Sequence, residues 1–229
     1  MRTIDIYLEA GQKRVFACAL AWPGWSRGGR DEEAAQQALL ASAPRYAAIL
    51  HAADIDFTPP TAVEDFTVVE RLPGNQSTDF GAPGVAPLAD GAAMNDDDFA
   101  RMQALLAAYW QALDAAVVAA TGKELRKGPR GGGRDLAGIV QHVIEADAGY
   151  LNRLAWKAKH DKRAPQPEQL AQIRHAILAA LDSAQQGNLP AQGPRGGVIW
   201  SPRYFVRRSA WHTLDHLWEI EDRIVEDAA

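Results

Sequence analysis

The chain has 229 residues, of which 47% are hydrophobic and 23% charged, a composition that excludes an intrinsically disordered chain. Lys and Arg number 24 against 29 Asp and Glu, and the resulting net charge of -5 argues against broad binding to nucleic-acid phosphates. The single cysteine, Cys18, excludes an intrachain disulfide and a Cys-rich zinc site, and it fits a reducing cytoplasm.

The sequence carries no targeting or membrane signal. Its first residues lack the apolar core of a signal peptide. The longest nearly apolar stretch, 104–120, contains Gln111 and Asp114 and is typical of a buried helix rather than a membrane span. We therefore expect a cytoplasmic protein that acts without a membrane and without a nucleic-acid partner.

Residues 1–72 predict a small α+β module of the order ββαβ. Asp31 is the predicted N-cap of its helix, and the Gly-rich segment 22–30 is expected to be a loop. The expected elements are a strand over 3–9, a strand over 14–21, a helix over 32–50 and a strand over 65–71.

Seven prolines and glycines between 73 and 95 predict a loose linker. The remainder, 96–229, changes to a helical period, and Ser201 followed by Pro202 marks a clear helix start. Four helices with no strand between them predict an all-α four-helix bundle. Their expected ranges are about 97–120, 135–158, 167–186 and 202–225.

Two histidines of the last helix, His212 and His216, are four residues apart. This spacing places both imidazoles on one helix face, about 6 Å apart, where they can bind one metal ion. Two unrelated histidines show the same spacing, so this alternative stays open. The glutamate that follows the first histidine in HExxH metalloproteases is missing, and that mechanism is therefore not indicated.

His142, on the second predicted helix of the bundle, is the third candidate ligand. On a helical wheel it lies about 100° from the centre of the apolar stripe, so a half-buried histidine with no ligand role is the alternative. All three histidines lie near the middle of their helices and can converge whichever way the helices run. Three histidine ligands leave a coordination position open, which is typical of a catalytic metal site.

Four acidic residues near the histidines are candidate partners for the imidazole N–H groups: Asp147, Asp215, Glu219 and Glu145. Each of them also fits the description of a solvated helix residue. Two Pro-Arg-Gly-Gly segments, 129–132 and 194–197, precede the histidine-bearing helices and make Arg130 and Arg195 candidate anion-binding residues. Plain glycine-rich connectors are the alternative.

No other catalytic pattern is present. There is no P-loop and no GxGxxG, and no nucleophilic triad can be assembled. Cys18 has apolar neighbours in a predicted strand, so we expect a buried core residue rather than a reactive thiol.

Residues 97–226 resemble the DinB/YfiT-like superfamily of metalloenzymes. The residues that carry the resemblance are Gln141-His142 and the segment AWHTLDHLWEIEDR over 210–223. The resemblance implies a four-helix bundle in up-down-down-up order. It also implies a divalent metal, often nickel or zinc, held by His142, His212 and His216. Characterised relatives include low-molecular-weight-thiol S-transferases and a thiol-dependent maleylpyruvate isomerase.

Residues 1–72 also resemble the HicB-like fold. The match consists of a strand, the segment AWPGW over 21–25, a following glycine at 28 or 29, and a helix opened by DEEA over 31–34. That family supplies antitoxins that usually carry a separate DNA-binding segment. No basic helix or ribbon of that kind is visible here, so we do not expect a repressor. A dimerisation or substrate-covering module is the expectation instead.

The sequence is therefore compatible with two functions. The first is a metal-dependent transferase in which the metal acidifies a low-molecular-weight thiol, so that this thiol attacks a small-molecule substrate. The catalytic side chains beyond the metal ligands are not assigned. The second is a non-catalytic binding or regulatory protein, in which the HicB-like module contacts a partner and the metal site is structural or vestigial.

Overall fold

The computed structural model describes residues 3–127, 133–193 and 196–225. It is a mixed α/β protein with a four-stranded sheet followed by helices. The chain divides into two compact units. The first comprises Met1–Ala93 and Val206–Trp211, and the second comprises Met94–Phe205 and His212–Ala229. The last helix therefore contributes residues to both units.

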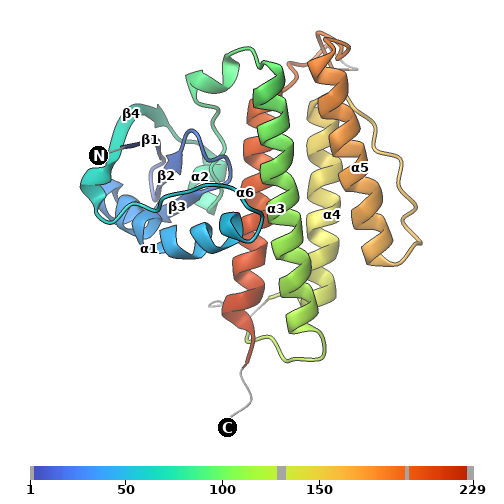
Figure 1. Ribbon diagram of the computed structural model, residues 1–229, viewed down its shortest axis with the longest axis horizontal. Coiled ribbons are helices and arrows are strands. Elements are labelled where there is room, and N and C mark those ends of the chain that lie inside the picture. Colours follow the sequence, from blue (N-terminus) through green and yellow to red (C-terminus); the bar gives the residue numbers. More distant parts are fainter. Residues whose placement is uncertain (1–2, 128–132, 194–195, 226–229) are drawn as a thin grey trace. The chain divides into compact units, whose positions relative to one another are not determined.

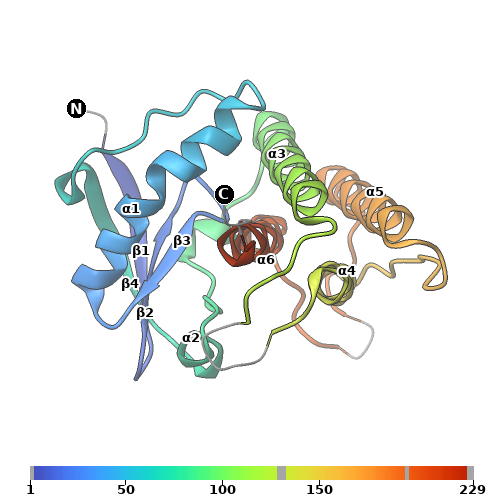
Figure 2. The same ribbon diagram turned by 90° about the horizontal axis from the view of Figure 1, so that it is seen from below.

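The N-terminal sheet has the strand order β3-β2-β1-β4. β1 pairs antiparallel with β2 and parallel with β4, and β2 pairs antiparallel with β3. The helix α1 (Glu32–His51) lies between β3 and β4 in the chain and packs against β2 and β3 (Figure 2). The strands are β1 (Ile4–Ala10), β2 (Val15–Ala19), β3 (Ser26–Gly29) and β4 (Phe66–Pro73).

The predicted order ββαβ is wrong by one strand, because part of the expected loop 22–30 forms β3. Its glycines permit close packing: a Cβ added at Gly29 would lie 2.3 Å from the Ala35 amide nitrogen of α1. At Gly28 it would lie 3.2 Å from the Phe16 ring. Glycine here allows close approach in a paired strand, whereas the composition alone indicated a loop.

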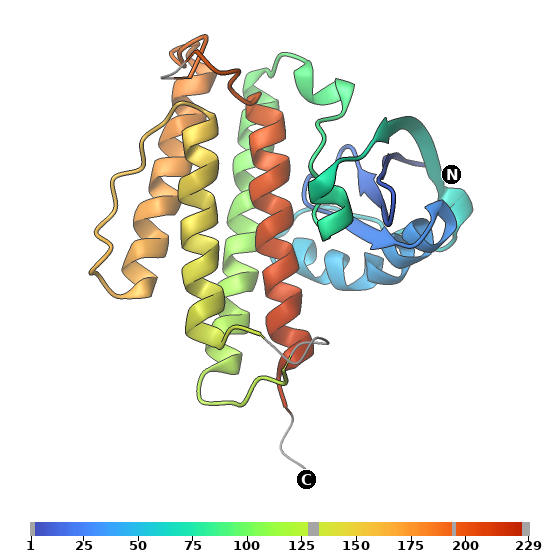
Figure 3. The same cartoon turned by 180° about the vertical axis from the view of Figure 1, so that it is seen from behind.

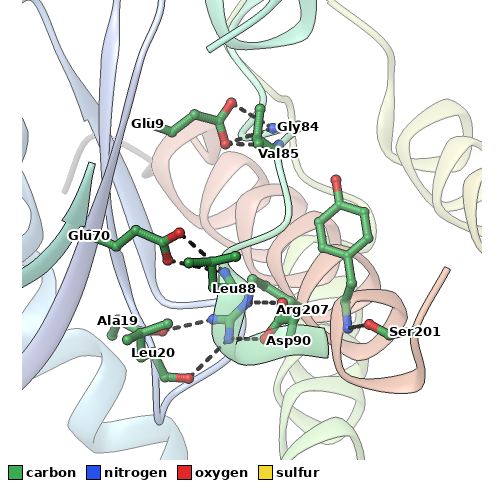
Figure 4. A network of polar contacts seen from close by, with 11 residues as sticks. Glu9, Ala19, Leu20, Glu70, Gly84, Val85, Leu88, Asp90, Ser201 and Arg207 are labelled. Carbon is green, nitrogen blue, oxygen red and sulfur yellow. Dashed lines mark hydrogen bonds and ion pairs between the residues drawn. The ribbon is translucent and has the colours of Figure 1, made fainter. Parts of the chain in front are cut away.

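The segment 73–95, predicted as a loose linker, contains regular structure. It carries the short helix α2 (Gln76–Phe80) and a short 3-10 helix, η2 (Leu88–Gly91). The buried carboxylate of Glu9 accepts hydrogen bonds from the amides of Gly84 at 2.8 Å and Val85 at 3.0 Å (Figure 4). These contacts with β1 order the segment, and composition does not reveal them.

A buried ion pair is the main polar feature of the first unit (Figure 4). Arg207 binds both carboxylate oxygens of Asp90 at 2.7 Å, and it donates to the carbonyls of Ala19 at 2.9 Å and Leu20 at 3.1 Å. Its guanidinium also lies 5.5 Å from the centre of the Tyr7 ring. Burial opposes the charge of Arg207, but the hydrogen bonds that Arg207 donates to Asp90 hold the Arg207 pKa above its ordinary value. The buried positive charge of Arg207 is therefore compensated by the Asp90 carboxylate and by two backbone carbonyls.

Four long helices follow, and Figures 1 and 3 show them side by side. Their starts are fixed by local caps: Asn95 accepts from the Asp98 amide at 2.8 Å, and Ser201 accepts from the Tyr204 amide at 3.2 Å. The helices are α3 (Asp96–Ala120), α4 (Leu136–Arg153), α5 (Gln166–Gln185) and α6 (Pro202–Arg223).

The second of these helices, α4, ends five residues earlier than the predicted boundary at 158. Ala155 has a φ of 57°, which a continuing helix does not allow. The connector 154–165 then leads to α5, and α4 and α5 run in the same direction (Figure 3). Extended at about 3.3 Å per residue, this connector spans about 40 Å. That exceeds the length of about 27 Å expected for α4 with its 18 residues.

The helix α3 contains the apolar stretch 104–120. By length and composition alone α3 could cross a membrane, and 44% of its most apolar window is buried within the described structure. Leu105, Leu106 and Leu113 are fully buried. This stretch thus contributes to the apolar core of the second unit.

Candidate metal centre

Three histidines from two helices of the second unit lie together. The Nε2 atom of His212 is 3.2 Å from the Nε2 atoms of both His142 and His216. The candidate ligand atoms of all three lie within 4.8 Å of one another. Their rings meet edge to face, with interplanar angles of 62° to 90°. The structure thus brings the three predicted ligands to a common point, although His142 lies at the flank of its helix's apolar stripe.

The nitrogen spacing suits a shared metal ion. A ring nitrogen carries either one hydrogen or one lone pair in the ring plane, so His212 Nε2 cannot form good hydrogen bonds to both neighbours at once. Tetrahedral coordination with metal–nitrogen distances of about 2.0–2.1 Å requires nitrogens about 3.3 Å apart. The two spacings of 3.2 Å match this requirement. The three imidazoles are therefore close enough to bind one metal.

Glu219 orients one of the three ligands. Its Oε2 lies 2.7 Å from Nδ1 of His216. An Nδ1–H that donates to this carboxylate leaves the lone pair on Nε2, which faces the other two histidines. The hydrogen bond from His216 lowers the pKa of Glu219, so the carboxylate is ionised at neutral pH. The carboxylate thereby fixes His216 in the tautomer that a metal ligand requires.

Glu219 is itself held by Arg223, one helical turn further along α6. Arg223 Nη1 lies 2.5 Å from Glu219 Oε1, and the same guanidinium donates to the carbonyls of Arg126 at 2.8 Å and Arg134 at 2.9 Å. Gly133 gives it room, because a Cβ there would lie 2.6 Å from Arg223 Nη2. Sequence reasoning missed Arg223, but the four-residue spacing from Glu219 is a signal that could have identified it.

The other three acidic residues predicted as imidazole partners lie on α4 and α6. Asp147 is buried on α4, and Asp215 is half-buried on α6. Glu145 accepts a hydrogen bond of 3.0 Å from the Gln141 amide group on an exposed part of α4. The anion-site candidates Arg130 and Arg195 lie outside the described residues.

His142 is the most accessible of the three histidines. It is half-buried, whereas His212 and His216 are 7% and 8% exposed. Burial, and next the neighbouring His216, hold the pKa of His142 below its ordinary value. A neutral imidazole is the form that binds a metal. The cluster therefore has two buried candidate ligands and one that is half-buried.

The only cysteine in the chain plays no part in this cluster. Cys18 is fully buried in β2, as predicted, and burial raises the pKa of its thiol to about 12. Comparisons with protein-family models, with curated proteins and with solved structures find no match to this chain. The role of the histidine cluster is therefore inferred from its own residues.

Proposed function

We propose that the protein is a metal-dependent enzyme in which His142, His212 and His216 hold one divalent ion, nickel or zinc. The observation that carries the proposal is the convergence of three Nε2 atoms, two pairs of them 3.2 Å apart, with Glu219 behind His216. A divalent ion held by three neutral imidazoles retains its full charge and would lower the pKa of a thiol or water at its open position.

The chain's own residues would bind the metal ion and orient the imidazole of His216. Glu219 sets the tautomer of His216, and Arg223 holds Glu219 in place. His142 is half-buried, and we assign the approach of the substrate to its side of the cluster. Because Cys18 is buried and protonated, the chain offers no thiol nucleophile. We therefore assign the nucleophile to an external low-molecular-weight thiol. Its proton passes to solvent, its sulfur bonds to an electrophilic carbon of the small-molecule substrate, and the group displaced from that carbon leaves with the bonding electron pair.

We infer a DinB/YfiT-like fold for the helical part. In this interpretation α3, α4, α5 and α6 are a four-helix bundle in up-down-down-up order. The parallel course of α4 and α5 and the long connector between them support it. So does the origin of the three histidines from α4 and α6, which are the second and fourth helices of this series.

We further propose a HicB-like identity for the N-terminal α+β module, with a role in dimerisation or in covering a substrate. Its three-strand meander with one parallel crossover to β4 supports this interpretation. The acidic net charge favours a protein that does not bind nucleic acid. A cytoplasmic location is proposed because the lone cysteine stays reduced and buried.

Metal analysis of protein purified without a histidine tag tests the proposal. We expect about one nickel or zinc ion per chain, or uptake of one ion when either metal is added to the purified protein. A panel of small thiols and electrophiles, assayed with metal-loaded and metal-free protein, then tests transferase activity. Less than about 0.2 ion per chain, with no uptake, would favour a non-catalytic binding or regulatory protein.

A further inference from the structure

One face of α4 leads away from the histidine cluster toward solvent. His142, Ala146, Gly149 and Arg153 follow one another at intervals of three or four residues and therefore share a face of the helix. A Cβ added at Gly149 would meet nothing within 4 Å, and Arg153 is exposed. The stripe is about 16 Å long at 1.5 Å per residue. Small side chains thus occupy the two positions of this face between His142 and Arg153.

Aromatic rings line the same region. The centre of the Tyr150 ring lies 5.8 Å from that of His212, edge to face, and 5.5 Å from that of Trp200. Trp200 in turn contacts Tyr204 at 4.9 Å, and its amide donates to the Arg153 carbonyl at 2.9 Å. These contacts connect the histidine cluster to Trp200 through a continuous set of rings.

Trp200 also lines an open surface pocket of about 410 Å³. The other lining residues come from the end of α5, the connector to α6 and the first residues of α6, and they include Leu189, Ile199 and Pro202. This volume lies within the range of small-molecule sites, about 300–1,000 Å³. A flat apolar group can therefore occupy the space beside the Trp200 ring.

Arg153 gives this region a positive charge. Its guanidinium lies 5.8 Å from the centre of the Trp200 ring, and within the described parts of the chain no carboxylate pairs with it. An arginine beside an indole ring suits a planar ligand with a carboxylate, because the ring stacks and the guanidinium binds both oxygens.

We propose that Trp200 and Arg153 form the docking site for one end of the substrate, an aromatic or conjugated carboxylate. The other end reaches the histidine cluster along this face of α4. This inference rests on the proposed metal-dependent function for its catalytic purpose, but the docking site itself needs no metal.

Binding of 2-naphthoate to the full-length metal-free protein, followed by ligand-observed NMR, tests the docking site. We expect saturable binding that weakens about tenfold or more in Trp200→Ala and recovers in part in Trp200→Phe. Arg153→Gln should weaken binding of 2-naphthoate about fivefold, yet leave binding of the neutral 2-naphthamide unchanged. Trp156→Leu and Lys157→Gln, in the connector after α4, are matched controls that should bind like the original protein. Equal losses in these controls, or no effect of Arg153→Gln, would overturn the proposal.

A second measurement separates this proposal from the proposed function. In protein loaded with Co²⁺, the bound naphthoate protons should relax faster than in protein loaded with diamagnetic Zn²⁺, and His216→Ala should remove the difference. Tight naphthoate binding without this enhancement, in protein shown to hold Co²⁺, would overturn the link between the docking site and the cluster. Failure to take up any metal would instead refute the proposed function, while the naphthoate result still decides the docking site.

Discussion

Two polar clusters, one in each unit, differ in how their groups face one another. Around Arg207, charged donors meet the Asp90 carboxylate and the carbonyls of Ala19 and Leu20, so each partner satisfies the other. Around His212, three ring nitrogens approach one point from different sides. A matched cluster contributes to stability, whereas converging nitrogens provide a place for a cation. The difference separates a cluster of mutually satisfied groups from a cluster that is close enough to bind a metal ion.

The largest effect on stability should come from breaking the matched cluster. Asp90→Ala leaves the Arg207 charge buried without its partner, and we expect a loss of about 3–5 kcal/mol in the free energy of unfolding. Urea denaturation of the metal-free protein measures it. Asp114→Ala is the control, because Asp114 is 49% exposed where it pairs with Arg174 and should cost less than about 1 kcal/mol. Similar losses in both variants would contradict the distinction.

Replacement of one of the three histidines should weaken metal binding and leave the fold intact. We expect His216→Ala to weaken nickel or zinc affinity more than about 100-fold, because the loss of a direct ligand exceeds the effect of losing an outer partner. Circular dichroism should show an intact helical protein. His160→Ala, in the connector between α4 and α5, should bind metal normally. Full metal content in His216→Ala would show that the cluster is not the metal site.

A smaller effect is expected when the ligand remains but its orientation is lost. Glu219→Gln keeps the shape of the side chain and removes the charge that fixes the Nδ1–H tautomer of His216. We expect metal affinity to fall about 10- to 100-fold, measured by competition with a chromogenic chelator. Glu145→Gln, on the exposed part of α4, is the matched control and should change nothing. An unchanged metal affinity in Glu219→Gln would show that the charge of the carboxylate does not contribute to metal binding.

The smallest expected effect is the dependence of stability and of metal affinity on pH. The pKa of His142 is lower in the folded protein than the ordinary value of 6.5, because of burial and the nearby His216. The unfolded chain therefore binds the proton more readily, so stability is full above about pH 6.5 and declines as the pH falls through the folded pKa. Urea midpoints of metal-free protein between about pH 5 and 7.5 should show this decline, and His142→Ala should reduce it. Metal affinity should weaken below about pH 6. An NMR titration that gives His142 a pKa above 6.5 would contradict the expected decline in stability, and a metal affinity that stays constant down to about pH 5 would contradict the second expectation.

The sequence predicts those parts of the site whose residues share one face of a single helix. The HxxxH spacing alone places His212 and His216 on one face, and Glu219 lies on the same face three residues later. The position of His142 could not be derived in this way, since its approach depends on how α4 is rotated against α6. Which acidic residue contacts an imidazole likewise depends on side-chain packing, and four candidates were indistinguishable in the sequence.

The sequence by itself determined where three of the long helices begin, because Asp31, Asn95 and Ser201 accept hydrogen bonds from amides only three residues away. Tertiary structure decided the features whose partners are distant along the chain. The strand β3, the ordered segment after β4 and the histidine cluster all belong to this class. The contacts Glu9–Gly84, His142–His212 and Asp90–Arg207 span 75, 70 and 117 residues. Local hydrogen bonds are visible in a short window of residues, whereas such contacts exist only once the chain has folded.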